Sequence, residues 1–115
     1  MTTVTFHSAD RRFDGFTVEG HSGYAEEGSD IVCAAISGVV GMVECTVNDV
    51  LGLAAAVKVD EGYMSLKLPG GLGQTNERIC RELLTGMMVY LQALSEEYLD
   101  NLIVRLEDDD DDDED

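Results

Sequence analysis

The stretch IVCAAISGVVGMVECTVNDV, residues 31–50, decides the fold, because its apolar residues recur every three or four positions. That spacing is typical of one face of an α-helix and predicts a helix from Ile31 to about Gly52. Its predicted buried stripe consists of Val32, Ile36, Val39 or Val40, Val43, Val47 and Val50. Close packing on one side of the helix is indicated by four small residues, Ala34, Ala35, Gly38 and Gly41.

Two strands are predicted before this helix. Apolar and polar residues alternate from Thr2 to His7, which is the period of a half-buried strand. A polar turn at Ser8 to Arg11 separates this strand from a second one at Phe13 to Gly20, in which Gly15 indicates a β-bulge. We therefore expect a hairpin, followed by an irregular, mobile segment from His21 to Asp30.

The chain after the first helix predicts a second hairpin, a second helix and a last strand. Val57 and Val59 precede a turn at Asp60-Glu61-Gly62, and the strand that follows contains Met64, Leu66 and Leu68 before Pro69 to Gly73 ends it. Asn76 is a suitable cap for the second helix. The buried face predicted for that helix is Ile79, Leu83, Met87, Tyr90 or Leu91, Leu94 and Tyr98. A strand at Leu102 to Leu106 completes the order ββαββα then β, which predicts an α+β fold with two helices and a small mixed, mainly antiparallel sheet.

The chain is acidic and ends in a run of acids. It has 115 residues, with 7 Lys and Arg against 24 Asp and Glu, which gives a formal net charge of −17. Nine of the acids form residues 107–115, so we expect one domain at residues 1–106 and a disordered acidic tail at 107–115. The body alone is still acidic, which disfavours direct nucleic-acid binding and favours a basic protein partner.

No signal peptide or membrane span is expected. Residues 1–4 lack a charged start and an apolar run, and the apolar stretch from Ile31 to Val43 is too short to cross a bilayer. The three cysteines include no CxxC pair and are expected to be reduced thiols. Together these features predict a cytoplasmic protein.

Cys33 is the candidate nucleophile. Ser29 or Asp30 is a good N-cap, which would place Cys33 in the first turn of the long helix, near its positive end. Eleven residues separate His21 from Cys33, enough for the imidazole to fold back over the helix start and act as a base. Other roles remain open from spacing alone: Cys33 as a small buried hydrophobe, His21 as a turn residue, Asp30 as a cap. Ser37, one turn beyond Cys33, either lines the same pocket or serves only in packing.

The run GHSGYAEEGSDIVCAA, residues 20–35, followed by Ser37, resembles the signature of the Prp family of bacterial ribosomal-processing cysteine proteases. The resemblance in element order covers residues 1–106. It implies that Cys33 is the nucleophile and His21 the base of a dyad, with Gly20, Asp30 and Ser37 supporting the site. It also implies a homodimer without metal or organic cofactor, which removes a short N-terminal extension from the large-subunit ribosomal protein L-twenty-seven. Backbone N–H groups near Val32 to Ala34 are candidates for oxyanion stabilisation.

The alternative function predicted for the chain is that of a non-catalytic acidic module that binds or chaperones a basic ribosomal protein, with Cys33 inert.

The remaining motifs in the sequence indicate ordinary structural roles. Residues 70–73, GGLG, lack the full pattern of a phosphate loop and predict a plain turn. Cys45 and Cys80 are expected to be packing residues, and no short-range ligand pair supports a metal site.

Overall fold

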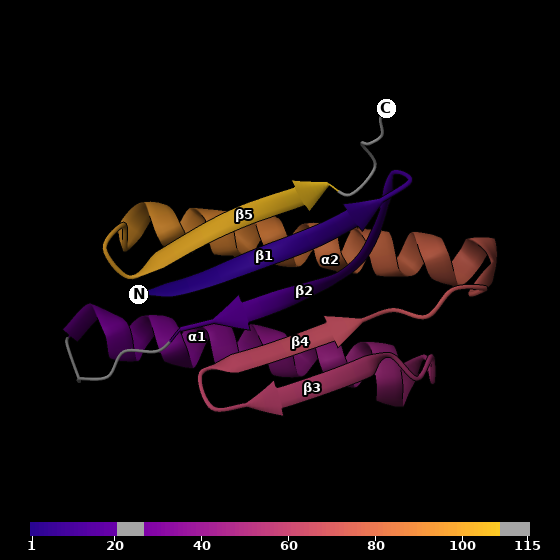
Figure 1. The fold of residues 1–115 in the computed structure, drawn as a ribbon, viewed down its shortest axis with the longest axis horizontal. Helices are drawn as coiled ribbons and strands as arrows, with labels where there is room; N and C mark the ends of the chain where they lie inside the picture. The colour runs from indigo at the N-terminus through magenta and orange to yellow at the C-terminus, as the bar shows by residue number, and fades with distance from the viewer. Residues whose placement is uncertain (21–26, 109–115) are drawn as a thin grey trace.

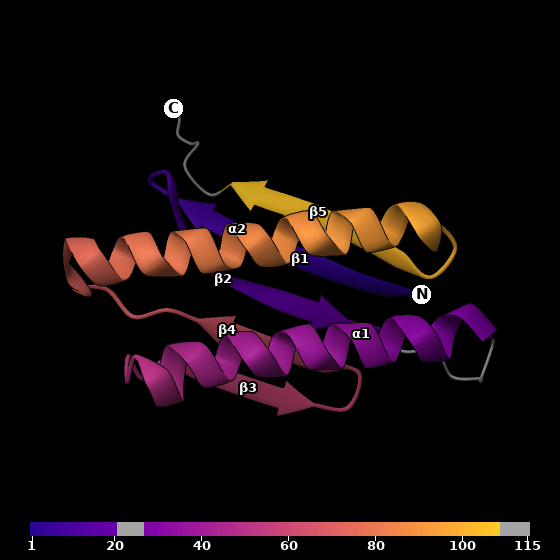
Figure 2. The ribbon, with the colours of Figure 1, turned by 180° about the vertical axis from the view of Figure 1, so that it is seen from behind.

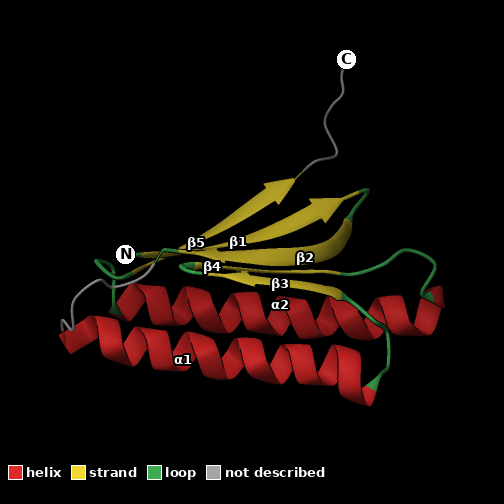
Figure 3. Cartoon of the chain, turned by 60° about the horizontal axis from the view of Figure 1, so that its bottom comes forward, coloured by secondary structure: helices red, strands yellow, loops and turns green. Residues whose placement is uncertain are grey.

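The computed structural model describes residues 1–20 and 27–108. Figures 1 and 3 show two layers, with a five-stranded sheet covered on one face by both helices and open on the other. The elements follow the chain as β1 (Thr2–Ala9), β2 (Arg12–Glu19), α1 (Glu27–Glu44), the π-helix η1 (Cys45–Val50), β3 (Ala56–Asp60), β4 (Tyr63–Lys67), α2 (Gly73–Glu97) and β5 (Leu102–Asp108). The predicted α+β class and element order are confirmed.

The strand order in the sheet is β3-β4-β2-β1-β5. Every neighbouring pair is antiparallel except β1 and β5, which are parallel. Phe6 pairs with Phe16, and Phe16 in turn pairs with Leu66, so one row of large side chains crosses the middle of the sheet. All three side chains are buried, on the face of the sheet that the helices cover. Figure 2 shows the molecule from the side of these helices.

Both predicted hairpins are present. The first turn is tighter than expected, since Asp10 and Arg11 alone connect the strands, both with positive φ (53° and 61°). The bulge predicted at Gly15 is confirmed by a register shift opposite His7 and Ser8. Only glycine fits at position 15, because a Cβ there would lie 2.0 Å from the carbonyl oxygen of Leu66. The backbones of β2 and β4 therefore approach each other more closely at Gly15 than any side chain would allow.

Helix α1 begins at Glu27, so residues 27–30 are helical rather than irregular, and the expected cap at Ser29 or Asp30 is wrong. Residues 21–26 of the expected irregular, mobile segment lie outside the described residues. Acidic residues in the first turn suit the positive end of a helix, which favours the earlier start at Glu27. At the other end the helix continues as η1 and stops before Gly52, as predicted. The side chain of Asn48 holds this end by accepting a hydrogen bond from the Ala55 N–H (2.7 Å) and donating to the Ala55 carbonyl (3.2 Å).

The buried stripe of this helix is narrower than predicted. Val32, Ile36, Val43 and Val47 are buried, Val39 and Val40 are half-buried, and Val50 is 73% exposed. The predicted close packing at the small residues is wrong for Gly38 and Gly41, where a Cβ would meet no described atom within 4 Å, whereas Ala35 is partly buried against the core.

Helix α2 begins at Gly73, so Asn76 lies inside the first turn rather than at the cap, and its side-chain amide donates to the carbonyl of Leu72 (3.3 Å). The residues of α2 buried against the sheet are Cys80, Leu84, Met87, Leu91 and Leu94. The predicted burial of Met87, Leu91 and Leu94 is confirmed. The prediction is wrong for Ile79 and Tyr90, which are 38% and 48% exposed, and Leu83 and Tyr98 are only partly buried. Apolar residues lie on more than one side of this helix, and contact with the sheet decides which of them are covered.

Strand β5 runs two residues beyond the expected domain boundary, because Glu107 and Asp108 pair with His7 and Ser8 of β1. The side chain of His7 links three strands at this end of the sheet. Its Nδ1 lies 3.0 Å from a carboxylate oxygen of Glu107, and its Nε2 lies 2.8 Å from the hydroxyl oxygen of Thr17. Residues 109–115 lie outside the described residues, and the disorder expected for them stays a prediction.

One helical stretch, Ile31–Val50, is long and apolar enough to cross a membrane by length and composition. The expectation that the apolar stretch is too short therefore fails on length, because the helix continues well past Val43. Its inner face, with Val32, Ile36 and Val43, packs into the hydrophobic core beneath the sheet, as the core helix of a folded domain does.

Candidate active site

Three of the five predicted site residues line one pocket. Gly20, Cys33 and Ser37 surround a cavity of about 150 Å³, together with Thr2, Val18 and Ile36. The pocket lies where the start of β1 and the end of β2 meet the second and third turns of α1. Cys33 is half-buried and Ser37 is exposed, so a thiol and a hydroxyl one helical turn apart border the same space.

Gly20 is held on two sides. Its N–H donates to the carbonyl of Gly62 in the β3–β4 turn (2.9 Å). Its φ of 90° is a conformation that favours glycine, and a Cβ at this position would lie 2.4 Å from the carbonyl oxygen of Met1. The chain therefore leaves β2 at a fixed point beside the pocket.

Cys33 does not lie in the first turn of its helix. Because α1 begins at Glu27, Cys33 is in the second turn, beyond the short range over which the helix end acts on a charge. The N–H groups of Val32 to Ala34 are inside the helix and are used by its own i to i−4 hydrogen bonds. The predicted oxyanion role of these three groups is therefore wrong.

The remaining predicted residues cannot be placed beside Cys33. His21 falls in the segment 21–26, outside the described residues. Asp30 belongs to the helical backbone of α1, and its side chain is likewise outside the described part. The dyad and the supporting role of Asp30 stay predictions.

Sequence reasoning missed Thr2, Val18 and Ile36 as pocket residues. Thr2 is the first residue of β1 and is 5% exposed, on the face it shares with Val4 and Phe6. The alternation of β1 already indicated that Thr2 points toward the helices, but only the pairing of the strands shows that it reaches the cavity beside Cys33.

The other two cysteines differ from each other. Cys80 is 1% exposed, as expected of a packing residue, and burial together with the nearby charge of Glu77 raises the pKa of its thiol. The expectation that Cys45 also packs is wrong, because its side chain is exposed. The pKa of Cys45 is raised by a hydrogen bond to Asp49 and by the negative charge of that carboxylate. Both effects disfavour a thiolate at neutral pH.

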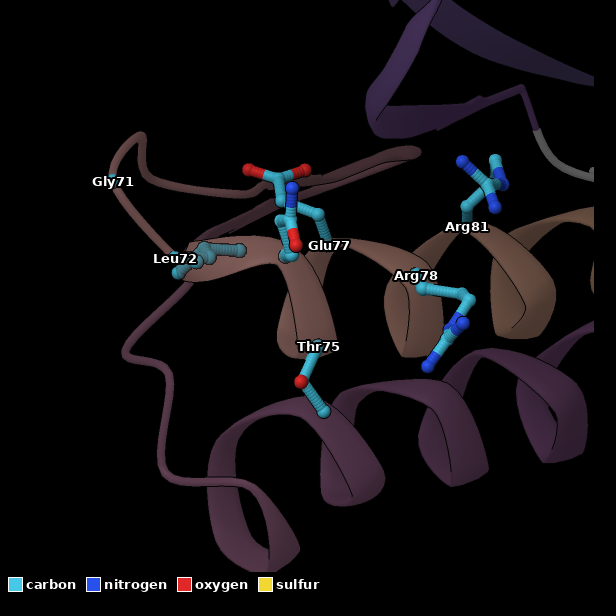
Figure 4. Close-up of a pocket in the computed structure, with 8 residues that line it drawn as sticks. Gly71, Leu72, Thr75, Glu77, Arg78 and Arg81 are labelled. Carbon is cyan, nitrogen blue, oxygen red and sulfur yellow. The ribbon is translucent and has the colours of Figure 1, made fainter.

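Larger cavities than the one beside Cys33 lie elsewhere in the described structure. A pocket of about 500 Å³ surrounds the start of α2 and is lined by Gly71, Leu72, Gly73, Gln74, Thr75, Glu77, Arg78 and Arg81 (Figure 4). The turn predicted at residues 70–73 thus forms one wall of this space. No group of three or more His, Cys, Asp or Glu side chains suited to a metal ion occurs within residues 1–20 and 27–108.

Comparison with known proteins places the chain among the cysteine proteases. Residues 1–103 match the model of the family Cysteine protease Prp, and the chain belongs to that family. It is 34% identical over 102 residues to the ribosomal processing cysteine protease Prp of Bacillus subtilis (strain 168), an alignment that covers 84% of this chain and 88% of that protein.

Solved structures agree with the fold. The essential ribosomal processing protease Prp from S. aureus in complex with a substrate peptide has a TM-score of 0.79 at 24% identity, covering 93% of this chain and 100% of that one. The same protease with a covalently linked product peptide has a TM-score of 0.76 at 24% identity, over the same shares of the two chains.

Proposed function

We propose that this chain is a cysteine endopeptidase that removes the short N-terminal extension of the large-subunit ribosomal protein L-twenty-seven, with Cys33 as nucleophile and His21 as base. The observation that carries the proposal is the single pocket formed by Gly20, Cys33 and Ser37. His21 directly follows Gly20, one of the residues that line this pocket, in the sequence. The peptide complexes of the S. aureus relative support a peptide as substrate.

The proposed reaction follows from the residue types. The Cys33 thiolate attacks the scissile carbonyl carbon, and the carbonyl oxygen becomes an oxyanion. His21, having taken the thiol proton, gives it to the leaving amine as the C–N bond breaks. Water then hydrolyses the thioester, which releases the new carboxylate and restores the thiol. Asp30 supports this reaction from the first turn of α1.

Ser37 takes over part of the role that the backbone of Val32 to Ala34 cannot fill. Its side chain borders the same cavity as Cys33 from the next turn of the helix, and a hydroxyl at that place has a proton to donate to a developing oxyanion. Removing one such donor costs about 100-fold in rate in well-studied hydrolases. We therefore expect Ser37→Ala to lower kcat and leave KM nearly unchanged.

The enzyme is proposed to work in the cytoplasm as a homodimer. Ile31 and Met42, on the side of α1 that faces away from the sheet, are 52% and 54% exposed, which suits burial against a second copy. An acidic enzyme of net charge −17 also attracts a basic, unstructured substrate tail. No direct contact with nucleic acid or membrane is needed for this activity.

Cleavage of a peptide that spans the junction between the extension and the mature protein tests the proposal. The parent should cut it, and Cys33→Ala and Cys33→Ser should not, while Cys45→Ala and Cys45→Ser provide matched controls on the same helix and should cut normally. If the Cys33 variants cleave as well as the parent, the nucleophile is misassigned. If the parent binds the peptide without cleaving it, the non-catalytic binding module becomes the better description.

A further inference from the structure

One polar side chain beside Cys33 is buried without a partner. Thr2, the first residue of β1, is 5% exposed and is the single buried polar or charged residue in the part of the chain that the structure describes. Its backbone N–H donates to the carbonyl of Asn101 (2.9 Å), whereas its hydroxyl forms no hydrogen bond within residues 1–20 and 27–108. Burial of an unbonded hydroxyl destabilises the folded protein, because the group loses its water and gains no partner in return.

The fold does not require a hydroxyl at this position. Thr2 lies on the same face of β1 as Val4 and Phe6, which are fully buried in the core. Valine has nearly the same shape as threonine, is equally suited to a strand and would leave no polar atom unpaired. Native proteins keep few unpaired buried groups, and a role toward a ligand is one reason to keep one.

The pocket beside Cys33 has two walls. Helix α1 supplies one wall and the first two strands supply the other, with Cys33, Ile36 and Ser37 on the helix wall and Thr2, Val18 and Gly20 on the sheet wall. Among these described residues, Thr2 is the single one on the sheet wall that has a polar side chain. A cavity of about 150 Å³ has room for one part of a bound peptide, about the size of a benzene ring.

We propose that Thr2 is a substrate-binding residue, whose hydroxyl forms a hydrogen bond with an amide group of the peptide that occupies the pocket beside Cys33. This inference rests on the proposed function and adds a residue to its site. The backbone of Thr2 is held by pairing with Leu102 and by the bond to Asn101, so the hydroxyl is in place before a peptide arrives. Because Thr2 and the nucleophile lie on different walls, this hydrogen bond is made equally in the bound substrate and in the transition state. It therefore contributes to KM rather than to kcat.

Isosteric variants in the peptide-cleavage assay test this role. Thr2→Val removes the hydroxyl and keeps the shape, so KM should rise about fivefold with kcat nearly unchanged, as expected for the loss of one hydrogen bond between uncharged groups. Thr2→Ser keeps the hydroxyl and should have a KM within about twofold of the parent's. An unchanged KM in Thr2→Val would overturn the proposal, as would an equal rise in Thr2→Val and Thr2→Ser.

Thr3→Val is the matched control for these variants. Thr3 is the next residue of β1 and lies on the open face of the sheet, because side chains alternate along a strand. Its replacement removes a hydroxyl from the same strand without touching the pocket, and KM should stay at the parent's value. A rise in KM equal to that of Thr2→Val would show a general effect on β1 and overturn the proposal.

Thermal unfolding without peptide separates a role in binding from a role in the fold. If the hydroxyl of Thr2 serves the substrate, Thr2→Val should have a Tm equal to or above that of the parent, because an unpaired buried group has been removed. If the hydroxyl instead stabilises the fold, Tm and activity should fall together. That result would overturn the proposal.

Peptide binding to an inactive variant keeps this test separate from the test of the proposed function. The probe is a fluorescein-labelled peptide that spans the cleavage junction, and fluorescence anisotropy gives its Kd for Cys33→Ala with and without Thr2→Val. The added substitution should weaken binding about fivefold, whether or not the parent cleaves the peptide. Equal Kd values would overturn the role of Thr2, whereas cleavage by Cys33→Ala would refute the nucleophile alone.

Discussion

Replacement of Gly15 by alanine should separate β2 from β4. The new Cβ would lie 2.0 Å from the carbonyl oxygen of Leu66, and contacts under 3.0 Å are essentially never observed, so the strands must move apart by at least about 1 Å. That shift breaks the hydrogen bond from the Leu68 N–H to the Asp14 carbonyl (2.7 Å) and weakens the neighbouring ladder bonds. With about 1 kcal/mol for each of two or three bonds and a further penalty for buried groups left unpaired, the loss is roughly 2–4 kcal/mol.

Urea and thermal unfolding measure this loss. For a domain of this size about 1 kcal/mol corresponds to roughly 4 °C, so Tm should fall by about 8–16 °C. Gly86→Ala is the matched control, because a Cβ at this position on α2 would meet no described atom within 4 Å and alanine favours a helix. It should raise stability by about 0.5–1 kcal/mol. A Gly15→Ala protein as stable as the parent would refute the steric reasoning.

Three further outcomes are expected. Leu84→Ala should cost about 3–5 kcal/mol in urea unfolding because this side chain is fully buried, and a loss below about 1 kcal/mol would contradict its place in the core. Asn48→Ala should cost about 1–3 kcal/mol, with a smaller loss for Asn48→Asp, which keeps the acceptor for the Ala55 N–H; equal losses would argue against that hydrogen bond. Asp49→Ala removes the hydrogen bond and charge that disfavour the Cys45 thiolate, so the pKa of Cys45 should fall and iodoacetamide should label it at lower pH, as mass spectrometry of its peptide would show. An unchanged labelling profile would count against the carboxylate.

The sheet was predictable because its cause is local. Alternation in β1 and the glycine-containing turn before β4 depend on neighbouring residues, and both are present in the structure. The start of α1 was missed because capping preference at Ser29 and Asp30 competes with the favourable placement of acids inside a first turn. Which side of α2 is buried depends on contact with a sheet formed from distant segments, and no local pattern contains that information.

In the candidate site too, features that depend on local sequence were predictable and features that depend on distant segments were not. Spacing along one helix predicts that Cys33 and Ser37 share a face, and the structure confirms that they share a pocket. The contribution of Thr2 depends on the register of β1 with β2 and was not predictable from a motif. The predicted position of Cys33 in the first turn was wrong because it was inferred from a predicted helix start that lies too late in the chain.

The place of β1 affects how the molecule can be assembled. One edge of this strand pairs with residues 12–19 soon after they are synthesised, whereas its other edge waits for residues 102–108. Until residues 102–108 have been translated, this edge of β1 therefore exposes a row of amides and carbonyls that have no strand partner. During that interval the unpaired edge of β1 can pair with strands of other chains, which leads to aggregation. Chaperones that cover this edge would therefore increase the yield of correctly folded enzyme.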